Sequence, residues 1–164
     1  MATNLDLAGK VARNVDLRSV NLRYARVEAS CEPEDIPEEA SVDLQYRSSI
    51  NKRKRRDDPA AVELAVTVDF KFHVQRQDED APSDVILLEA GYLLVYALNP
   101  EAELEEECFD QFAEVNGPYN AWPYWRELVQ SVTGRLGLPG FVLPVFRPAK
   151  KELEAPPAEG ERQS

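Results

Sequence analysis

Histidine, cysteine and positive charge are scarce in this chain. Its single histidine is His73, and its two cysteines, Cys31 and Cys108, lie far apart in the sequence. A structural zinc site needs four ligands, mostly cysteine and histidine at short spacing, so this sequence argues against one. We expect both cysteines to be reduced, while a disulfide between them stays open as the alternative.

Acidic residues outnumber basic ones by 30 to 19, which gives a formal net charge of -11 at pH 7. Such a field repels nucleic acid and anionic lipid, and it attracts basic partners. The apolar runs are too short to span a bilayer, and the first residues do not resemble a signal peptide. We therefore expect a cytoplasmic protein that neither binds nucleic acid nor inserts into a membrane.

Catalytic motifs are also missing. The sequence has no glycine-rich phosphate loop, nucleophile elbow or HExxH pair. His73 lies on the polar side of an expected strand without a catalytic partner pattern, so we interpret it as a solvated strand residue. The basic run at residues 52–56 is followed by Asp57 and Asp58, which favours a charged turn over a nucleic-acid patch. We expect neither an enzyme nor a metal or cofactor site.

Four segments show the alternation of apolar and polar residues that is typical of antiparallel strands. Val20, Leu22 and Tyr24 share one side of the first, and the second covers residues 42–47. The third, residues 62–75, has seven apolar residues on one side and polar residues on the other. The fourth, residues 85–98, is apolar on both sides, which predicts that another subunit covers it.

Helical spacing follows the strands. Residues 101–115 predict a short helix, which Asn116-Gly117-Pro118 should end. A second helix should begin near Pro123, where a missing N–H costs nothing, and end at Gly137 and Pro139. Strands followed by helices indicate an α+β fold, namely a four-stranded antiparallel sheet with helices on one face.

We divide the chain into three parts. Residues 1–14 form a flexible or short helical N-terminus, and residues 15–146 form one folded domain. Residues 147–164 are rich in proline and glutamate, which predicts a disordered tail.

Residues 138–146, LPGFVLPVF, are too apolar for an ordinary surface loop and too interrupted by proline and glycine for a helix. Two interpretations stay open. The segment is either an apolar strap packed on its own sheet, or an exposed surface that binds extended polypeptide.

Residues 122–146, WPYWRELVQSVTGRLGLPGFVLPVF, resemble the helix and crossover loop of SecB chaperones. In that family an aromatic-Pro-Tyr-x-Arg-Glu start leads into a helix that ends near Arg-Gly, and an apolar loop with proline follows. The resemblance extends upstream through Glu28-Ala29 and Leu87-Leu88-Glu89, and it covers roughly residues 15 to 146. The matching residues in the motif are Pro123, Tyr124, Arg126, Glu127, Arg135, Pro139, Leu143 and Pro144.

The resemblance implies a SecB-like sheet-and-helix fold and a homotetramer built as a dimer of dimers. It implies an ATP-independent chaperone, a holdase, that keeps unfolded preproteins in apolar grooves and delivers them to the SecA motor ATPase in protein export. The SecA contact would use Glu28, Leu87 and Glu89, although Tyr24 stands where an acid is expected. We expect client contacts from Tyr46, Trp122, Phe141, Val142, Leu143, Val145 and Phe146.

Two departures from the family, Tyr24 at an expected acidic position and the missing second long helix, keep alternatives open. The second long helix of the family is not matched, since Leu153 is the only large apolar residue after Phe146. Divergent SecB-like proteins serve toxin–antitoxin systems, in which they bind the aggregation-prone tail of an antitoxin, and this chain fits that role as an alternative. A non-chaperone adaptor, with its apolar loop permanently buried in one partner, is the third hypothesis.

Overall fold

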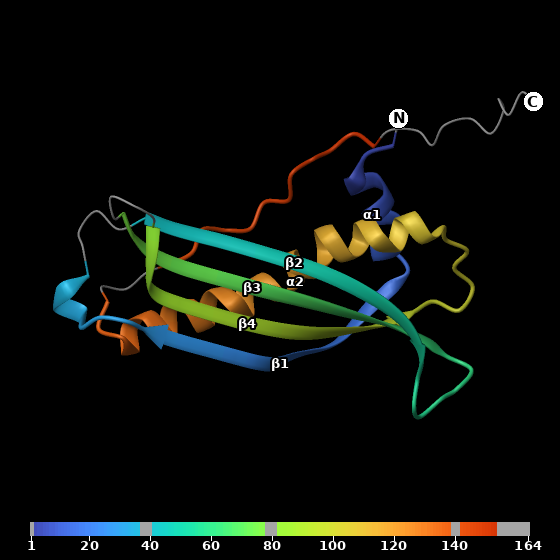
Figure 1. The fold of residues 1–164 in the computed structure, drawn as a ribbon. Helices are drawn as coiled ribbons and strands as arrows, with labels where there is room; N and C mark the ends of the chain where they lie inside the picture. Colours follow the sequence, from blue (N-terminus) through green and yellow to red (C-terminus); the bar gives the residue numbers. More distant parts are fainter. Residues whose placement is uncertain (1, 37–40, 78–81, 139–141, 154–164) are drawn as a thin grey trace, which may run out of the picture.

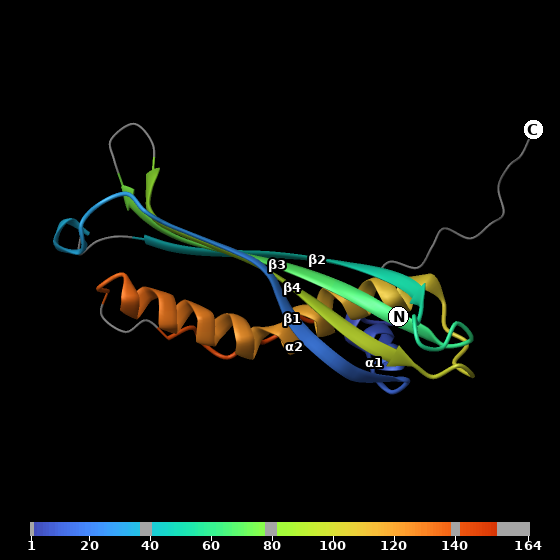
Figure 2. The same ribbon diagram turned by 90° about the horizontal axis from the view of Figure 1, so that it is seen from below.

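The computed structural model describes residues 2–36, 41–77, 82–138 and 142–153. In these residues a four-stranded antiparallel sheet forms one layer, and two α-helices form a second layer on one of its faces (Figures 1 and 2). This arrangement confirms the predicted α+β fold class. The elements, in chain order, are α1 (Asn4–Ala12), β1 (Val15–Ala29), a short 3-10 helix (Pro33–Asp35), β2 (Ser41–Lys54), β3 (Val62–Gln77), β4 (Pro82–Leu98) and α2 (Glu106–Arg135).

The strands lie in the order β1-β4-β3-β2, so β3 and β4 are central and β1 and β2 form the edges. The predicted apolar side of β3 is buried beneath the helices, as is the matching side of β4. Alternate residues of a strand point to opposite faces, so the other half of each strand lies on the face that the described helices leave uncovered, here called the open face. The fully buried side chains of this core include Leu64, Val66, Val68, Phe70, Phe72, Leu88, Leu94 and Tyr96.

Helix α2 is continuous where the sequence predicts two helices with a break at residues 116–118. It runs for 30 residues through Pro118 and Pro123 and changes direction near its middle (Figure 2). A proline in a helix removes one backbone hydrogen bond and bends the helix. Tertiary packing can nevertheless keep the two halves together as one bent helix. Gly117 supplies such packing, because a Cβ added there would lie 2.9 Å from Cγ1 of Val66 in β3. The local break signal is therefore outweighed by the close approach of α2 to the sheet.

A bulge in β1 overturns the predicted alternation of its side chains. Leu22 pairs with Tyr92 on the helix side, and the register then skips Arg23. Tyr24 consequently pairs with Gly91 and lies on the open face, opposite to Leu22. An extra residue in one strand reverses the side chains that follow it, which strict alternation does not reveal.

Helix α1 spans Asn4–Ala12, within the segment that the sequence analysis left as flexible or helical. Thr3 caps it: the Thr3 hydroxyl accepts a hydrogen bond from the Asp6 amide at 3.2 Å, and the Asp6 carboxylate accepts one from the Thr3 amide at 2.9 Å. This reciprocal capping box satisfies two backbone donors that the first turn leaves free. Leu7 and Val11 are buried, and α1 packs against α2.

Residues 142–153, here called the strap, return from the end of α2 past the edge strand β2 to the start of α1 (Figure 1). Asn4 holds its far end. The Asn4 amide donates to the Lys151 carbonyl at 3.0 Å, and the Asn4 side chain accepts from the Lys151 amide at 2.7 Å and donates to the Ala149 carbonyl at 2.9 Å. The predicted disorder from residue 147 is therefore wrong as far as residue 153, because α1 offers polar partners that the sequence does not reveal. Residues 154–164 lie outside the described residues.

Two glycines of α2 give a matched test of its contact with the sheet. Gly117→Ala would press a methyl group into the fully buried, stiff side chain of Val66, whereas a Cβ at Gly134 meets no atom within 4 Å. We expect Gly117→Ala to lower the free energy of unfolding by about 1–3 kcal/mol. Gly134→Ala should raise it by about 0.5–1 kcal/mol, because alanine favours the helix. Urea unfolding measures both, and equal effects of the two substitutions would contradict the close contact.

Candidate functional site

An aromatic groove lies between the edge strand β2 and helix α2. It is lined by Tyr46 of β2 and by Tyr119 and Trp122 of α2, and the ring of Phe146 from the strap occupies it. The centroid of the Phe146 ring lies 5.3 Å from that of Trp122, 5.6 Å from that of Tyr46 and 6.4 Å from that of Tyr119. These distances are those of attractive aromatic pairs, so the groove is built to hold a ring.

The groove is only partly covered. Tyr46 and Tyr119 are 47% and 54% exposed, whereas Trp122 is 6% exposed. Exposed tyrosines gathered at one place, rather than scattered, are typical of interaction surfaces. Tyrosine suits such a surface, because its ring makes apolar contacts while its hydroxyl stays solvated.

The strap turns some of its side chains toward the protein and others toward solvent. Leu143 is 2% exposed, whereas Val142 and Val145 are 51% and 66% exposed. The Trp122 indole donates a hydrogen bond to the Pro144 carbonyl at 2.8 Å, which fixes the strap between its two inward residues. Each of the two interpretations from the sequence is thus met in part: the segment packs on its own domain and also leaves apolar side chains exposed.

Six of the seven predicted client-binding residues lie within this region. Tyr46, Trp122 and Phe146 meet in the groove, and Leu143 is buried beside them. Phe141 lies outside the described residues. Tyr119 is the residue that the sequence analysis missed, because it falls just after the predicted helix break and only a continuous helix brings it to the groove.

Two hollows flank the Phe146 ring. One, of about 360 Å³, is bordered by Tyr46, Phe146 and the far part of the strap near Asn4. The other, of about 270 Å³, is bordered by Tyr119, Trp122, Val145 and Phe146. Phe146 borders both hollows, so its ring is a shared wall of the two spaces.

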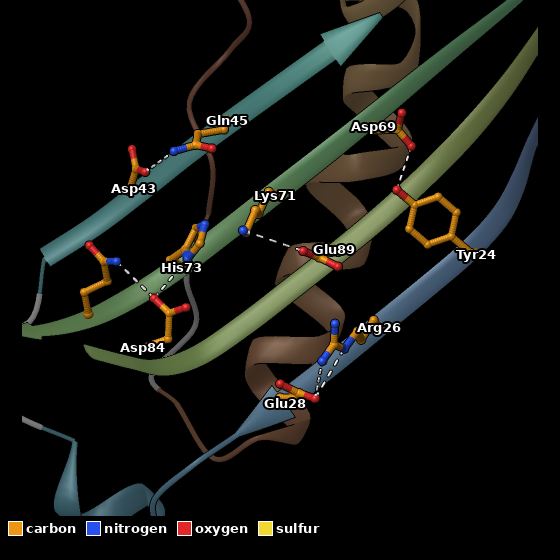
Figure 3. A network of polar contacts seen from close by, with 11 residues as sticks. Tyr24, Arg26, Glu28, Asp43, Gln45, Asp69, Lys71, His73, Asp84 and Glu89 are labelled. Atoms are coloured by element: carbon orange, nitrogen blue, oxygen red, sulfur yellow. Dashed lines mark hydrogen bonds and ion pairs between the residues drawn. The ribbon is translucent and has the colours of Figure 1, made fainter. Parts of the chain in front are cut away.

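The open face carries a network of polar side chains across all four strands (Figure 3). The three residues predicted to contact SecA meet here: Glu28 pairs directly with Leu87, and Glu89 follows two residues later on the same side of β4. Both carboxylates have basic neighbours, since Arg26 lies 2.7 Å from Glu28 and Lys71 lies 3.8 Å from Glu89. The patch formed by Glu28, Leu87 and Glu89 is therefore less acidic than its residue types suggest.

Tyr24 is built into this face. Its ring covers Gly91, where an added Cβ would lie 2.2 Å from the ring, and its hydroxyl donates to Asp69 at 2.6 Å. An aromatic side chain laid over a strand glycine compensates for the missing side chain. Burial, followed by the hydrogen bond to Asp69, raises the pKa of Tyr24 to about 12.

His73 also lies on the open face, but the prediction that it is solvated is wrong. Its side chain is buried, and its Nδ1 atom lies 3.0 Å from the carboxylate of Asp84. Its cross-strand neighbours are Asp43 of β2 and Leu87 of β4, which a single-strand pattern cannot show. Hydrogen bonds from Gln75 and His73 hold the pKa of Asp84 below its ordinary value.

Within the described ranges, the acidic, histidine and cysteine side chains form no cluster suited to a metal ion. None of the helices in that part of the chain combines the length and the apolar content that a membrane span requires. Three side chains of the basic run are paired with acids: Lys52 with Glu106, Arg53 with Glu63, and Arg55 with Asp57.

No protein-family model matches the chain, and a comparison with curated proteins finds no relative. Among solved structures it is similar to the SecB-like chaperone Rv1957 of Mycobacterium tuberculosis, solved in complex with a ChAD peptide from the antitoxin HigA1 (Rv1956). The TM-score is 0.69 at 23% sequence identity, and the match covers 87% of this chain and 99% of that one. The chain therefore has the fold of a SecB-like chaperone.

A second solved structure, a protein of unknown function from Streptococcus agalactiae, is 16% identical and gives a TM-score of 0.45. That match covers 79% of this chain and 96% of the other.

Proposed function

We propose that this protein is an ATP-independent holdase that binds an extended apolar segment of another polypeptide in the aromatic groove. The groove itself is the observation that carries this proposal, because it gathers the exposed rings of Tyr46 and Tyr119 around a site that already holds the ring of Phe146. Binding there would shift the client toward its unfolded state by mass action. We expect the protein to act in the cytoplasm, as its sequence suggests.

Affinity would come from many shallow apolar contacts. Burial of apolar surface gives about 25 cal/mol per Å², from which the cost of ordering the client is subtracted. Several such contacts along one chain give tight but reversible holding. The net charge of -11 would keep a loaded complex soluble and attract basic stretches of the client.

An antitoxin is the favoured client. The support comes from the similarity to a SecB-like chaperone that was solved with an antitoxin peptide. A toxin–antitoxin gene pair next to the gene for this protein would support this role. An adaptor, by contrast, predicts one tight partner and no general holding activity.

The holdase proposal predicts that the protein suppresses aggregation of a reduced, unfolding test protein at stoichiometric amounts without ATP. Replacing both Tyr46 and Tyr119 with Ser should weaken client binding about tenfold, because two exposed aromatic contacts are lost. Tyr124→Ser is the matched control, since Tyr124 is a similarly exposed tyrosine of α2 whose ring lies against Tyr92 of β4. Light scattering measures the suppression and fluorescence anisotropy measures the affinity. Absence of suppression by protein shown to be folded would refute the proposal.

Delivery to SecA is a second candidate function, which the placement of Glu28, Leu87 and Glu89 on one face favours. In that case Glu89→Lys should abolish binding to SecA, because it reverses a charge in the centre of the patch, and leave client holding intact. Glu107→Lys, an exposed acid in the first turn of α2, controls for the change in net charge. Surface plasmon resonance with purified SecA measures the effect, and an unchanged affinity would remove Glu89 from the contact.

We also propose that the protein forms a homo-oligomer through the edge strand β1. On the helix-facing side of the edge strand β1, Leu17, Leu22 and Val27 are between 42% and 50% exposed, a continuous apolar surface of the kind that subunit interfaces cover. The apolar pattern of the sequence instead suggests a covering subunit on β4 and gives no signal for this edge.

The solution mass, measured by light scattering after gel filtration, should accordingly be that of a dimer or tetramer. Changing Leu22 and Val27 together to Glu should reduce it to the monomer mass, because the added charges would be buried in the interface. Val62→Glu serves as the control for an exposed valine elsewhere on the sheet. A monomeric wild-type protein would contradict the proposed oligomer.

A further inference from the structure

The aromatic groove is already occupied by a segment of its own chain. We propose that residues 143–146 of the strap are an internal ligand of the groove, which an extended client segment of the same pattern must displace. The identity of the client rests on the proposed function, whereas the docking of the strap rests on contacts within this chain.

The strap shows which pattern the groove accepts. Its two inward residues, Leu143 and Phe146, are three positions apart, and Pro144 lies between them. A three-residue repeat brings side chains to the same side of a polyproline II chain, the conformation that proline favours. The Pro144 carbonyl between them accepts the indole N–H of Trp122 at 2.8 Å. The ligand class is therefore an extended, proline-containing segment with a large aliphatic residue three positions before an aromatic one.

Displacement would open a larger site than the one now visible. The Phe146 ring borders hollows of about 360 Å³ and 270 Å³, so its departure would add the volume of the ring to the space beside them. The rings of Tyr46, Tyr119 and Trp122 would then be free to hold an aromatic side chain of the client. Because the strap leads directly from α2, it competes at the high effective concentration of a tethered ligand.

Asn4 provides a handle on the strap that lies outside the groove rings. Its three hydrogen bonds, to the Lys151 carbonyl, the Lys151 amide and the Ala149 carbonyl, secure the far end of the strap. Asn4 is the first residue of α1, where alanine is compatible with the helix. Asn4→Ala should therefore loosen the strap without altering Tyr46, Tyr119 or Trp122.

The opposite hypothesis is that the strap is a permanent wall of the site. The two hypotheses predict opposite signs. If the strap competes, loosening it raises the affinity for an added ligand, because the binding-competent fraction of the protein rises. If the strap is a wall, loosening it lowers that affinity.

The probe is a labelled synthetic peptide of residues 142–149, Val-Leu-Pro-Val-Phe-Arg-Pro-Ala, with a control peptide in which the phenylalanine is alanine. We expect Asn4→Ala and Phe146→Ala each to bind the probe about tenfold more tightly than the wild type. Arg147→Gln, an exposed strap residue next to Phe146, should bind like the wild type, and the control peptide should bind all four proteins weakly. Fluorescence anisotropy measures the affinities.

A second readout follows the strap directly. The indole N–H of Trp122 should exchange with solvent faster in Asn4→Ala than in the wild type, because its bond to the Pro144 carbonyl opens more often. Faster exchange with tighter probe binding supports the internal ligand. Equal or weaker probe binding by both variants, with unchanged circular dichroism, overturns it.

The outcomes also separate this inference from the proposed function. Tight probe binding by the two variants, without suppression of aggregation by any of the proteins, would leave the internal ligand standing and refute the holdase. Suppression of aggregation together with the same probe affinity in all variants would support the holdase and refute the internal ligand.

Discussion

The stacking of Trp125 on Phe70 positions everything else in this structure. The two rings are nearly parallel, at 8°, with centroids 5.0 Å apart, and they join the second half of α2 to the central strand β3. Gly117 makes the corresponding contact for the first half, where a side chain would collide with Val66. Together these contacts hold a helix that contains two prolines against the sheet along its length. Without them, Tyr119 and Trp122 would have no fixed position relative to Tyr46.

The aromatic groove is an outward continuation of this core. Phe70 lies 5.9 Å from Trp122 and 6.2 Å from Tyr46, centroid to centroid, so the buried stack passes directly into the exposed wall. This continuity supplies rigidity, because the rings that would face a client are held from behind by packed ones. A preorganised surface loses less conformational entropy on binding than one assembled from mobile loops. The same apolar chemistry thus stabilises the fold on one side and, in the proposed function, would bind the client on the other.

Periodicity predicted the fold class because the core depends on it: the apolar side of β3 faces the helices as its alternation indicates. The errors all arise where a distant partner decides the outcome. The bulge at Arg23 turns Tyr24 toward Gly91, and no local pattern reports the strand that lies opposite. His73 is buried by neighbours from other strands, and the end of the strap is held by Asn4, 147 residues earlier in the sequence than Lys151. In the candidate site, the apolar loop and the resemblance to SecB suggested the aromatic and aliphatic residues, but only the tertiary structure separates inward from outward ones.

That separation of 147 residues gives the strap a particular place in the stability of the molecule. Closing so long a loop is unfavourable until the intervening chain has folded, after which the ends already lie close together. The strap is therefore expected to dock last during folding and to detach first during fluctuations, as a cooperative unit of low local stability. The stacked core of Trp125 and Phe70 does not include the strap. If the strap opens as we propose, the groove would be exposed at a cost well below that of global unfolding.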